Sequence, residues 1–122
     1  MSDAEPVSIR LASAGDLDGL VRLEEAFPEE DRFPRRTWRR LLDGHTVAHV
    51  AVSGGTLVGA AVLLFRTGSR VARLYTLSVT PDLRGKGIAR QLLAAGETAA
   101  AEKECDRMRL EARESNQHAI LL

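Results

Sequence analysis

The chain of 122 residues is long enough for one small domain with a hydrophobic core and too short for two. Its 17 Lys and Arg residues balance its 17 Asp and Glu residues, which argues against a general nucleic-acid-binding domain. No segment approaches the roughly 18 unbroken apolar residues of a membrane helix, and the acidic, polar start is unlike a secretory signal. The single cysteine, Cys105, cannot form an internal disulfide, and no Cys/His cluster has zinc spacing. We therefore expect one cytoplasmic domain with no metal, no membrane contact and no nucleic-acid partner.

The first third of the chain predicts one strand and two helices. Residues 7–11 alternate between apolar and polar side chains, as in a strand. Apolar residues at helical spacing then predict a helix over about residues 14–26, which Pro28 ends. Pro34 suits the first turn of a second helix, in which Trp38 is interpreted as a packing anchor.

The middle of the chain predicts three antiparallel strands. Two apolar segments, residues 47–53 and 56–67, flank a glycine pair, which is a hairpin signal. A second turn precedes residues 71–79, which are rich in β-branched and aromatic side chains. The alternation in the first of these strands places His49 on the less buried face of the sheet.

The last third predicts a crossover connection. Residues 88–104 read as a long helix, residues 107–113 as a strand, and residues 114–116 as the start of another helix. Strands on either side of a long helix are parallel as a rule. The predicted fold class is therefore α/β (α+β), a mixed sheet whose first half is antiparallel and which carries helices on both faces.

The segment TPDLRGKGIARQLL, residues 80–93, places two glycines and three cationic side chains before this long helix. A helix N-terminus carries unpaired N–H groups and a partial positive charge, and glycines allow a ligand to approach the backbone. Such a site suits phosphate, and Arg84, Lys86 and Arg90 would add positive charge at its rim. Residues 84–90 are therefore interpreted as a pyrophosphate cradle.

Two common phosphate loops do not fit this segment. A P-loop requires G-x-x-x-x-G-K-S/T, whereas Ile88 follows Gly87. A dinucleotide fingerprint requires G-x-G-x-x-G/A, whereas Arg90 occupies its last position. That fingerprint also normally follows the first strand of a βαβ unit, and this loop comes late in the chain.

The segment instead resembles the acetyl-CoA loop of the GNAT family of N-acetyltransferases, whose pattern is Q/R-x-x-G-x-G/A. The matching residues are Arg84, Gly85, Lys86, Gly87, Ile88 and Ala89. The flanking strand LYTLSV, the long helix, and the segments RMRLEAR and ESNQHAILL follow the family order. The last segments are similar to those of ribosomal-protein N-terminal alanine acetyltransferases. The resemblance covers nearly the whole chain in element order and is motif-level from about residue 74 to residue 122.

The resemblance implies the residues that would hold acetyl-CoA. The pantetheine arm would lie between two parallel strands that splay apart, here residues 74–79 and 107–113, with a bulge in the first strand. Backbone groups of Leu77, Ser78 and Val79 would bind pantetheine and polarise the thioester carbonyl. Asn116 matches an asparagine that contacts CoA, and a helix N-cap is an alternative role for it.

The resemblance also implies direct transfer of the acetyl group to a primary amine, such as a protein N-terminus, a lysine or a small amine. Glu111 matches the family carboxylate assigned as general base. The alternative for Glu111 is a solvent-facing carboxylate or an ion pair with a neighbouring arginine. The family tyrosine that protonates the leaving thiolate would follow Leu122, so we expect residues 1–122 to be a single acetyltransferase domain that is incomplete at its C-terminus.

Two other functions stay open at this stage. One is a non-catalytic acyl-CoA-binding or regulatory module of the same fold, and the other is a nucleotide-binding domain of another family, which would bind ATP and CoA equally. An incomplete sheet edge also leaves open a homodimer formed by strand or helix exchange.

An acidic group lies between the first two helices. It comprises Glu24, Glu25, Glu29, Glu30 and Asp31. It is either a solvated face or an acidic rim that attracts a cationic amine. Four arginines follow it: Arg35, Arg36, Arg39 and Arg40. They could pair with the acidic group, or form a basic strip that meets an acidic partner or the CoA 3′-phosphate.

Overall fold

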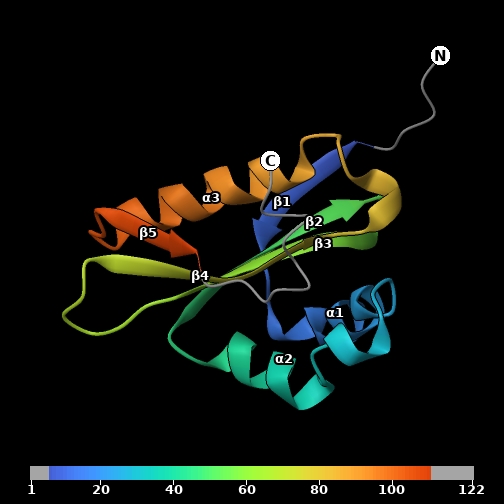
Figure 1. Ribbon diagram of the computed structural model, residues 1–122, viewed down its shortest axis with the longest axis horizontal. Coiled ribbons are helices and arrows are strands. Elements are labelled where there is room, and N and C mark those ends of the chain that lie inside the picture. The colour runs from blue at the N-terminus through green and yellow to red at the C-terminus, as the bar shows by residue number, and fades with distance from the viewer. Residues whose placement is uncertain (1–5, 111–122) are drawn as a thin grey trace.

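The computed structural model describes residues 6–110 as a mixed sheet with helices on both faces (Figure 1). The strands are β1 (Val7–Leu11), β2 (Thr46–Ser53), β3 (Thr56–Leu64), β4 (Val71–Val79) and β5 (Arg107–Leu110). The helices are α1 (Leu17–Glu24), α2 (Arg35–Asp43) and α3 (Ile88–Glu102), with short 3-10 turns η1 (Ala14–Asp16), η2 (Glu29–Asp31) and η3 (Pro81–Leu83). Among the helices of residues 6–110, none is long and apolar enough to cross a membrane.

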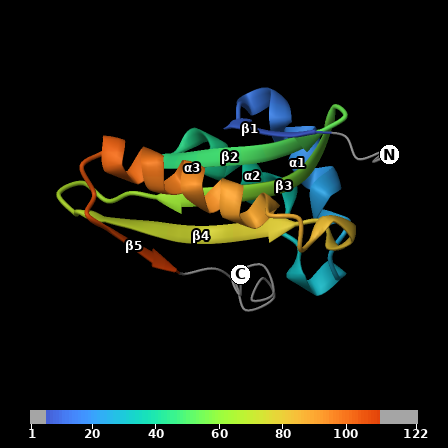
Figure 2. The ribbon, with the colours of Figure 1, turned by 90° about the horizontal axis from the view of Figure 1, so that it is seen from above.

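The five strands follow one another in the sheet in the order in which they occur in the chain (Figure 2). The first four are antiparallel: β2, β3 and β4 are joined by short turns, whereas the connection from β1 to β2 contains α1 and α2. β5 lies parallel to β4, with pairs from Val71↔Arg107 to Leu74↔Leu110, and α3 forms the crossover between the two strands. The predicted fold class is therefore confirmed, including its parallel pair.

Each face of the sheet carries its own hydrophobic core. On the α3 face, Leu74, Leu77 and Leu92 are almost completely buried. On the α1 and α2 face, Leu20 and Trp38 are each 1% exposed. Burying one such side chain contributes about 1.5–3 kcal/mol to folding. The interpretation of Trp38 as a packing anchor is confirmed.

Gly59 allows β3, β4 and α3 to pack closely together. A Cβ atom at this position would lie 2.9 Å from the backbone oxygen of Ser78 and 3.2 Å from Leu92 Cδ1. The first distance is shorter than any ordinary carbon–oxygen contact, and backbone in mid-sheet cannot move aside easily. Glycine is therefore required at position 59 because β4 and α3 approach β3 closely there, opposite the C-terminal end of β4.

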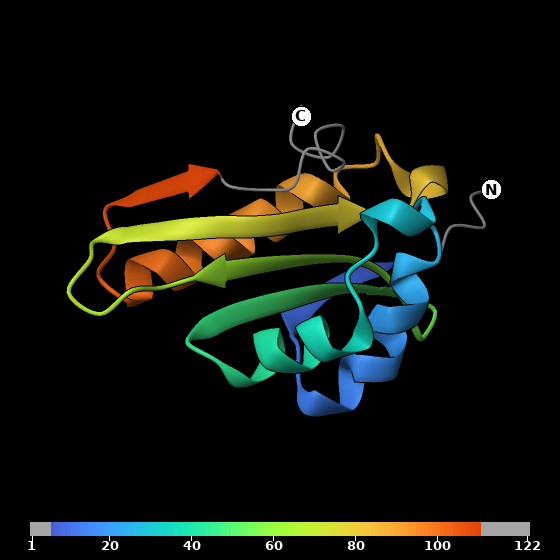
Figure 3. The same cartoon turned by 60° about the horizontal axis from the view of Figure 1, so that its bottom comes forward.

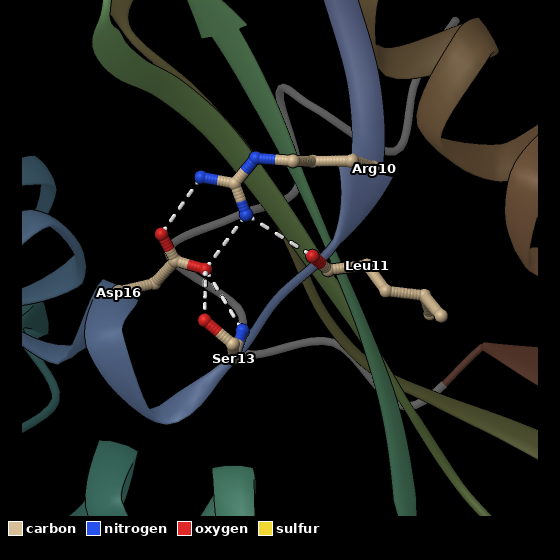
Figure 4. Close-up of polar contacts among 4 residues, drawn as sticks. All are labelled: Arg10, Leu11, Ser13 and Asp16. Atoms are coloured by element: carbon tan, nitrogen blue, oxygen red, sulfur yellow. Dashed lines mark hydrogen bonds and ion pairs between the residues drawn. The ribbon is translucent and has the colours of Figure 1, made fainter.

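A bidentate ion pair fixes the corner between β1 and η1 (Figure 4). Arg10 donates to both carboxylate oxygens of Asp16, at 2.8 and 2.9 Å, and the Ser13 amide donates to the same carboxylate at 2.8 Å. Arg10 also donates to the Leu11 carbonyl at 3.1 Å. The hydrogen bond from Arg10, helped by that from Ser13, lowers the pKa of Asp16 below its ordinary value.

Two expectations about side-chain placement are wrong. His49 is not on a less buried face: it belongs to the set of β2 residues that face α3, is only 9% exposed, and has its pKa lowered by burial. Arg35 does not pair with the acidic group between the helices. Its guanidinium contacts Asp18 of α1 at 2.7 Å, because α1 and α2 pack side by side.

Candidate functional site

A β-bulge interrupts β4 near its middle. Leu63 pairs with Leu74 and the preceding Val62 pairs with Thr76, which leaves Tyr75 as the extra residue. Leu74 lies in the core on the α3 face, whereas Tyr75 packs against the core on the other face. The bulge that the family resemblance implies is therefore present in this strand.

Beyond the bulge, β4 continues past its described pairs with β5. Its described pairs with β5 end at Leu74↔Leu110, although β4 continues to Val79. Ser78 pairs with Ala60 of β3, and Thr80 donates to the Val58 carbonyl at 2.9 Å, so these residues turn their backbone groups towards β3. Alternation then directs the backbone groups of Leu77 and Val79 to the β5 side. Two of the three predicted pantetheine-binding residues thus turn their backbone groups away from β3, and the Ser78 backbone faces β3.

The glycine loop follows η3 and leads into α3. Gly85 and Gly87 have φ angles of 82° and 83°, a region that favours glycine, and Gly87 is the N-cap of α3. A Cβ added at either glycine would meet no atom within 4 Å, so the space before the helix is open. Within the described residues, no acceptor is recorded for the N–H groups of Ile88, Ala89 or Arg90. This donor-rich helix N-terminus fits a pyrophosphate group.

The three cationic side chains of the loop behave differently. Lys86 and Arg90 are exposed, and neither takes part in the ion pairs recorded among residues 6–110. Arg84 instead folds back onto the protein. Its Nε donates to the Val79 carbonyl at 3.3 Å, and its guanidinium carbon lies 5.9 Å from the centre of the Phe27 ring.

The connection between α1 and α2 lies beside the C-terminal end of β4 (Figure 3). Arg32 holds its start by donating to the Phe27 carbonyl at 2.9 Å and to the Glu25 carbonyl at 3.3 Å. The Phe33 amide donates to the Glu24 carboxylate at its end. Glu24 is only 2% exposed, so it is a buried capping group for this segment and does not belong to an acidic rim.

The remainder of the acidic group is accessible. Glu25, Glu29 and Glu30 are exposed, and Asp31 is half-buried. They lie on the same connection that contacts β4 and the glycine loop. The connection between α1 and α2 therefore carries exposed carboxylates, which would attract a positively charged molecule.

The aromatic contacts across this site were not predicted from the sequence. The rings of Phe33 and Tyr75 are stacked, and Trp38 meets Phe33 edge-on with centroids 5.6 Å apart. Tyr75 is half-buried, packs against the core on the α1 and α2 face, and lies at the bulge. No periodicity in the sequence pairs residues 33 and 75, because a bulge carries no reliable sequence signal of its own.

Other predicted residues lie outside this constellation. Glu111 and Asn116 fall outside the described residues, so their predicted roles stay predictions. Within residues 6–110 no group of three or more His, Cys, Asp or Glu side chains could hold a metal ion. Cys105 is half-buried and packs against the core on the α3 face.

Comparison with known proteins identifies the family. The profile of the acetyltransferase (GNAT) family matches residues 16–122. N-alpha-acetyltransferase RimI of Mycobacterium tuberculosis (strain ATCC 25618 / H37Rv) is 36% identical over 96 residues, which cover 75% of this chain and 61% of that protein. The chain thus matches less than two thirds of the length of this relative.

Solved structures agree with the sequence matches. Ribosomal-protein-alanine N-acetyltransferase from Brucella melitensis biovar Abortus 2308 is 25% identical, with a TM-score of 0.77 over 94% of this chain and 86% of that one. The PaiA N-acetyltransferase of Thermoplasma acidophilum in complex with coenzyme A shares the fold, with a TM-score of 0.79 over 94% and 84% of the two chains at 19% identity. Together with the bulged β4 and the glycine loop, these matches show that the chain belongs to the acetyltransferase (GNAT) family.

Proposed function

We propose that this chain is the acetyl-CoA-binding part of an N-acetyltransferase that transfers an acetyl group to a primary amine. One observation carries the proposal. The N-terminus of α3, with two left-handed glycines whose added Cβ atoms would meet no atom of the described residues within 4 Å, follows the end of β4, where the backbone groups of Leu77 and Val79 point away from β3. A pyrophosphate and an extended pantetheine arm require these two features side by side.

Each part of the site has a role in holding acetyl-CoA. The N–H groups at the start of α3 would bind the pyrophosphate oxygens, and Lys86 and Arg90 would add charge. The outward backbone groups of Leu77 and Val79 would pair with pantetheine as a further strand would. Acetyl-CoA supplies a thioester, whose acetyl group a neutral amine attacks directly. The role of general base is proposed for Glu111.

The proposed acceptor is the N-terminal amine of a protein or peptide. Support comes from the printed activities of two relatives, an N-alpha-acetyltransferase and a ribosomal-protein-alanine N-acetyltransferase. The exposed carboxylates of Glu25, Glu29 and Glu30 also favour the approach of a cationic amine. A lysine or a small amine carries the same charge, so a panel of acceptors is needed to distinguish them.

Calorimetric titration of the purified chain tests the cosubstrate. We expect saturable binding of acetyl-CoA and none of ATP. Gly87→Glu should abolish binding, because its carboxylate would occupy the phosphate position. Gly68→Glu is a matched control: Gly68 also has a left-handed φ, 81°, with no atom within 4 Å of an added Cβ, but it lies in the turn before β4, at the other end of that strand. Equal loss of binding in both variants would contradict the loop assignment.

An activity assay then tests transfer. Release of free CoA is followed with an alanine-initiated peptide, the same peptide already N-acetylated, a lysine-containing blocked peptide and spermidine. Any turnover should occur with the first peptide and not with its acetylated form. Glu111→Gln should slow that turnover while acetyl-CoA binding is retained. Tight binding of acetyl-CoA without turnover of any acceptor would instead support the non-catalytic binding module.

A further inference from the structure

Arg84 is the first residue of the glycine-loop pattern, and the family resemblance places it among the residues around the phosphate. Its guanidinium nevertheless makes both of its recorded contacts away from the loop. Nε donates to the Val79 carbonyl, and the guanidinium carbon lies over Phe27, which is 8% exposed in the core beside α1. Arg84 is exposed, as Lys86 and Arg90 are, but no such contact is recorded for Lys86 or Arg90 among residues 6–110.

Phe27 belongs to a segment that is itself held in place. Arg32 donates to its carbonyl at 2.9 Å, and the Phe33 amide at the far end of the segment donates to buried Glu24. Because these hydrogen bonds hold the connection between α1 and α2 together, a side chain that packs on Phe27 is positioned relative to the entire connection. Arg84 thus joins three parts of the site: the C-terminal end of β4 through the Val79 carbonyl, the glycine loop through its own backbone, and the connection between α1 and α2 through Phe27.

We propose that Arg84 is a positioning residue, which sets the connection between α1 and α2 against the cofactor loop, and that Lys86 and Arg90 are the loop's phosphate-binding cations. The inference rests on the proposed function, because it concerns the placement of the acceptor side relative to acetyl-CoA. Through its hydrogen bond to the Val79 carbonyl, Arg84 fixes the last residue of β4. Resting on Phe27, it fixes the surface from which the acceptor approaches.

Two sets of measurements separate positioning from phosphate binding. The first is the dissociation constant of CoA for wild type, Arg84→Gln, Lys86→Gln and Arg90→Gln at several KCl concentrations. Losing an exposed cation that faces a phosphate should weaken binding about two- to fivefold and flatten the salt dependence. We expect this for Lys86→Gln and Arg90→Gln, and we expect Arg84→Gln to keep the wild-type affinity and salt dependence within about twofold.

The second set uses acetyl transfer to the alanine-initiated peptide. Arg84→Gln should raise the KM for the peptide and leave that for acetyl-CoA unchanged, whereas Lys86→Gln should do the reverse. Phe27→Leu removes the ring beneath Arg84 and should reproduce the effect on the peptide. The double variant Arg84→Gln/Phe27→Leu should be no worse than either single variant, because both remove the same contact. Circular dichroism confirms that each variant is folded.

The outcomes distinguish this inference from the proposed function. If wild type does not bind CoA, the proposed function fails and the inference with it. If wild type binds CoA but Arg84→Gln loses affinity and salt dependence as Lys86→Gln does, Arg84 is a phosphate ligand. The inference is then overturned and the proposed function stands. Additive effects of Arg84→Gln and Phe27→Leu on the peptide KM would also overturn it.

Discussion

Phe33 and Tyr75 lie in parallel planes, 2° apart, with ring centroids separated by 5.6 Å. This separation is that of an offset stack, and it joins the start of α2 to the bulge of β4. Phe33→Ala should lower the free energy of unfolding by about 3–5 kcal/mol, because it removes a buried ring and leaves a cavity. Urea denaturation followed by circular dichroism measures the change.

Tyr75→Phe is the matched variant for this stack, because it keeps the ring and removes only the hydroxyl. We expect its stability to stay within about 0.5 kcal/mol of wild type. A loss as large as that of Phe33→Ala would mean that the hydroxyl, and not the ring, holds this contact.

Gly59→Ala should destabilise the protein by about 1–3 kcal/mol, because its Cβ would collide with the Ser78 carbonyl and with Leu92. Gly15→Ala is a suitable comparison, because the nearest atom to its added Cβ is 3.7 Å away. That variant should change stability by no more than about 0.5 kcal/mol. Thermal unfolding of both variants measures the difference. If Gly59→Ala unfolds at the wild-type temperature, the close-approach argument is refuted.

Asp16 should make the protein's stability depend on acidity. Its pKa is lowered in the folded state by Arg10, so the unfolded chain binds the proton more tightly. The stabilisation is therefore present above the unfolded pKa of about 3.9 and is lost as the pH falls through the lower, folded value. Asp16→Asn should be less stable than wild type at neutral pH, and the difference should vanish in acid.

Asp18→Asn provides the control for Asp16. The Arg35–Asp18 pair has a similar length, 2.7 Å, but both of its side chains are well exposed, so water screens it. We expect Asp18→Asn to have almost no effect at any pH. Equal effects of the two substitutions would show that geometry and burial at the β1–η1 corner are unimportant.

His49 should affect the protein's stability in a higher pH range than Asp16 does. Burial lowers its pKa, so below the ordinary value of about 6.5 the unfolded state takes up a proton that the folded state resists. Stability should therefore decrease as the pH falls through this range. Arg10, Glu102 and Lys103 line the same groove as His49, so His49→Leu is needed to isolate its contribution. Urea midpoints at several pH values should vary less in that variant than in wild type.

The sequence predicted the order of elements well because each one has a strong local signal. The alternating residues of β4 were placed at the observed bounds, Val71–Val79, and the hairpin between β2 and β3 follows from its glycine pair. The first helix is divided into η1 and α1, and α1 ends at Glu24. Helix ends depend on tertiary contacts, here the capping of Phe33 by Glu24, which periodicity does not contain.

Side-chain roles were harder to predict than elements. The glycines of the loop are predictable because their left-handed backbone conformation favours glycine. The contacts of Arg84 and Lys86 are not, because the two cations of one motif interact differently. Charge alone does not say which cation folds back onto Phe27. Glu24 was likewise grouped with its acidic neighbours, because a carboxylate that caps a distant amide looks like any other in the sequence.

The bulge at Tyr75 makes the length of β4 as important as its composition. Before the bulge Ala72 and Leu74 face α3, and after it Leu77 and Val79 do so, which shifts the alternation by one residue. Deleting one residue between Leu74 and Leu77 would remove the bulge and restore regular alternation, with Leu77 and Val79 still facing α3. A one-residue deletion elsewhere in β4, between Leu77 and Val79 for example, would instead send the apolar side chain that follows it to the other face of the sheet.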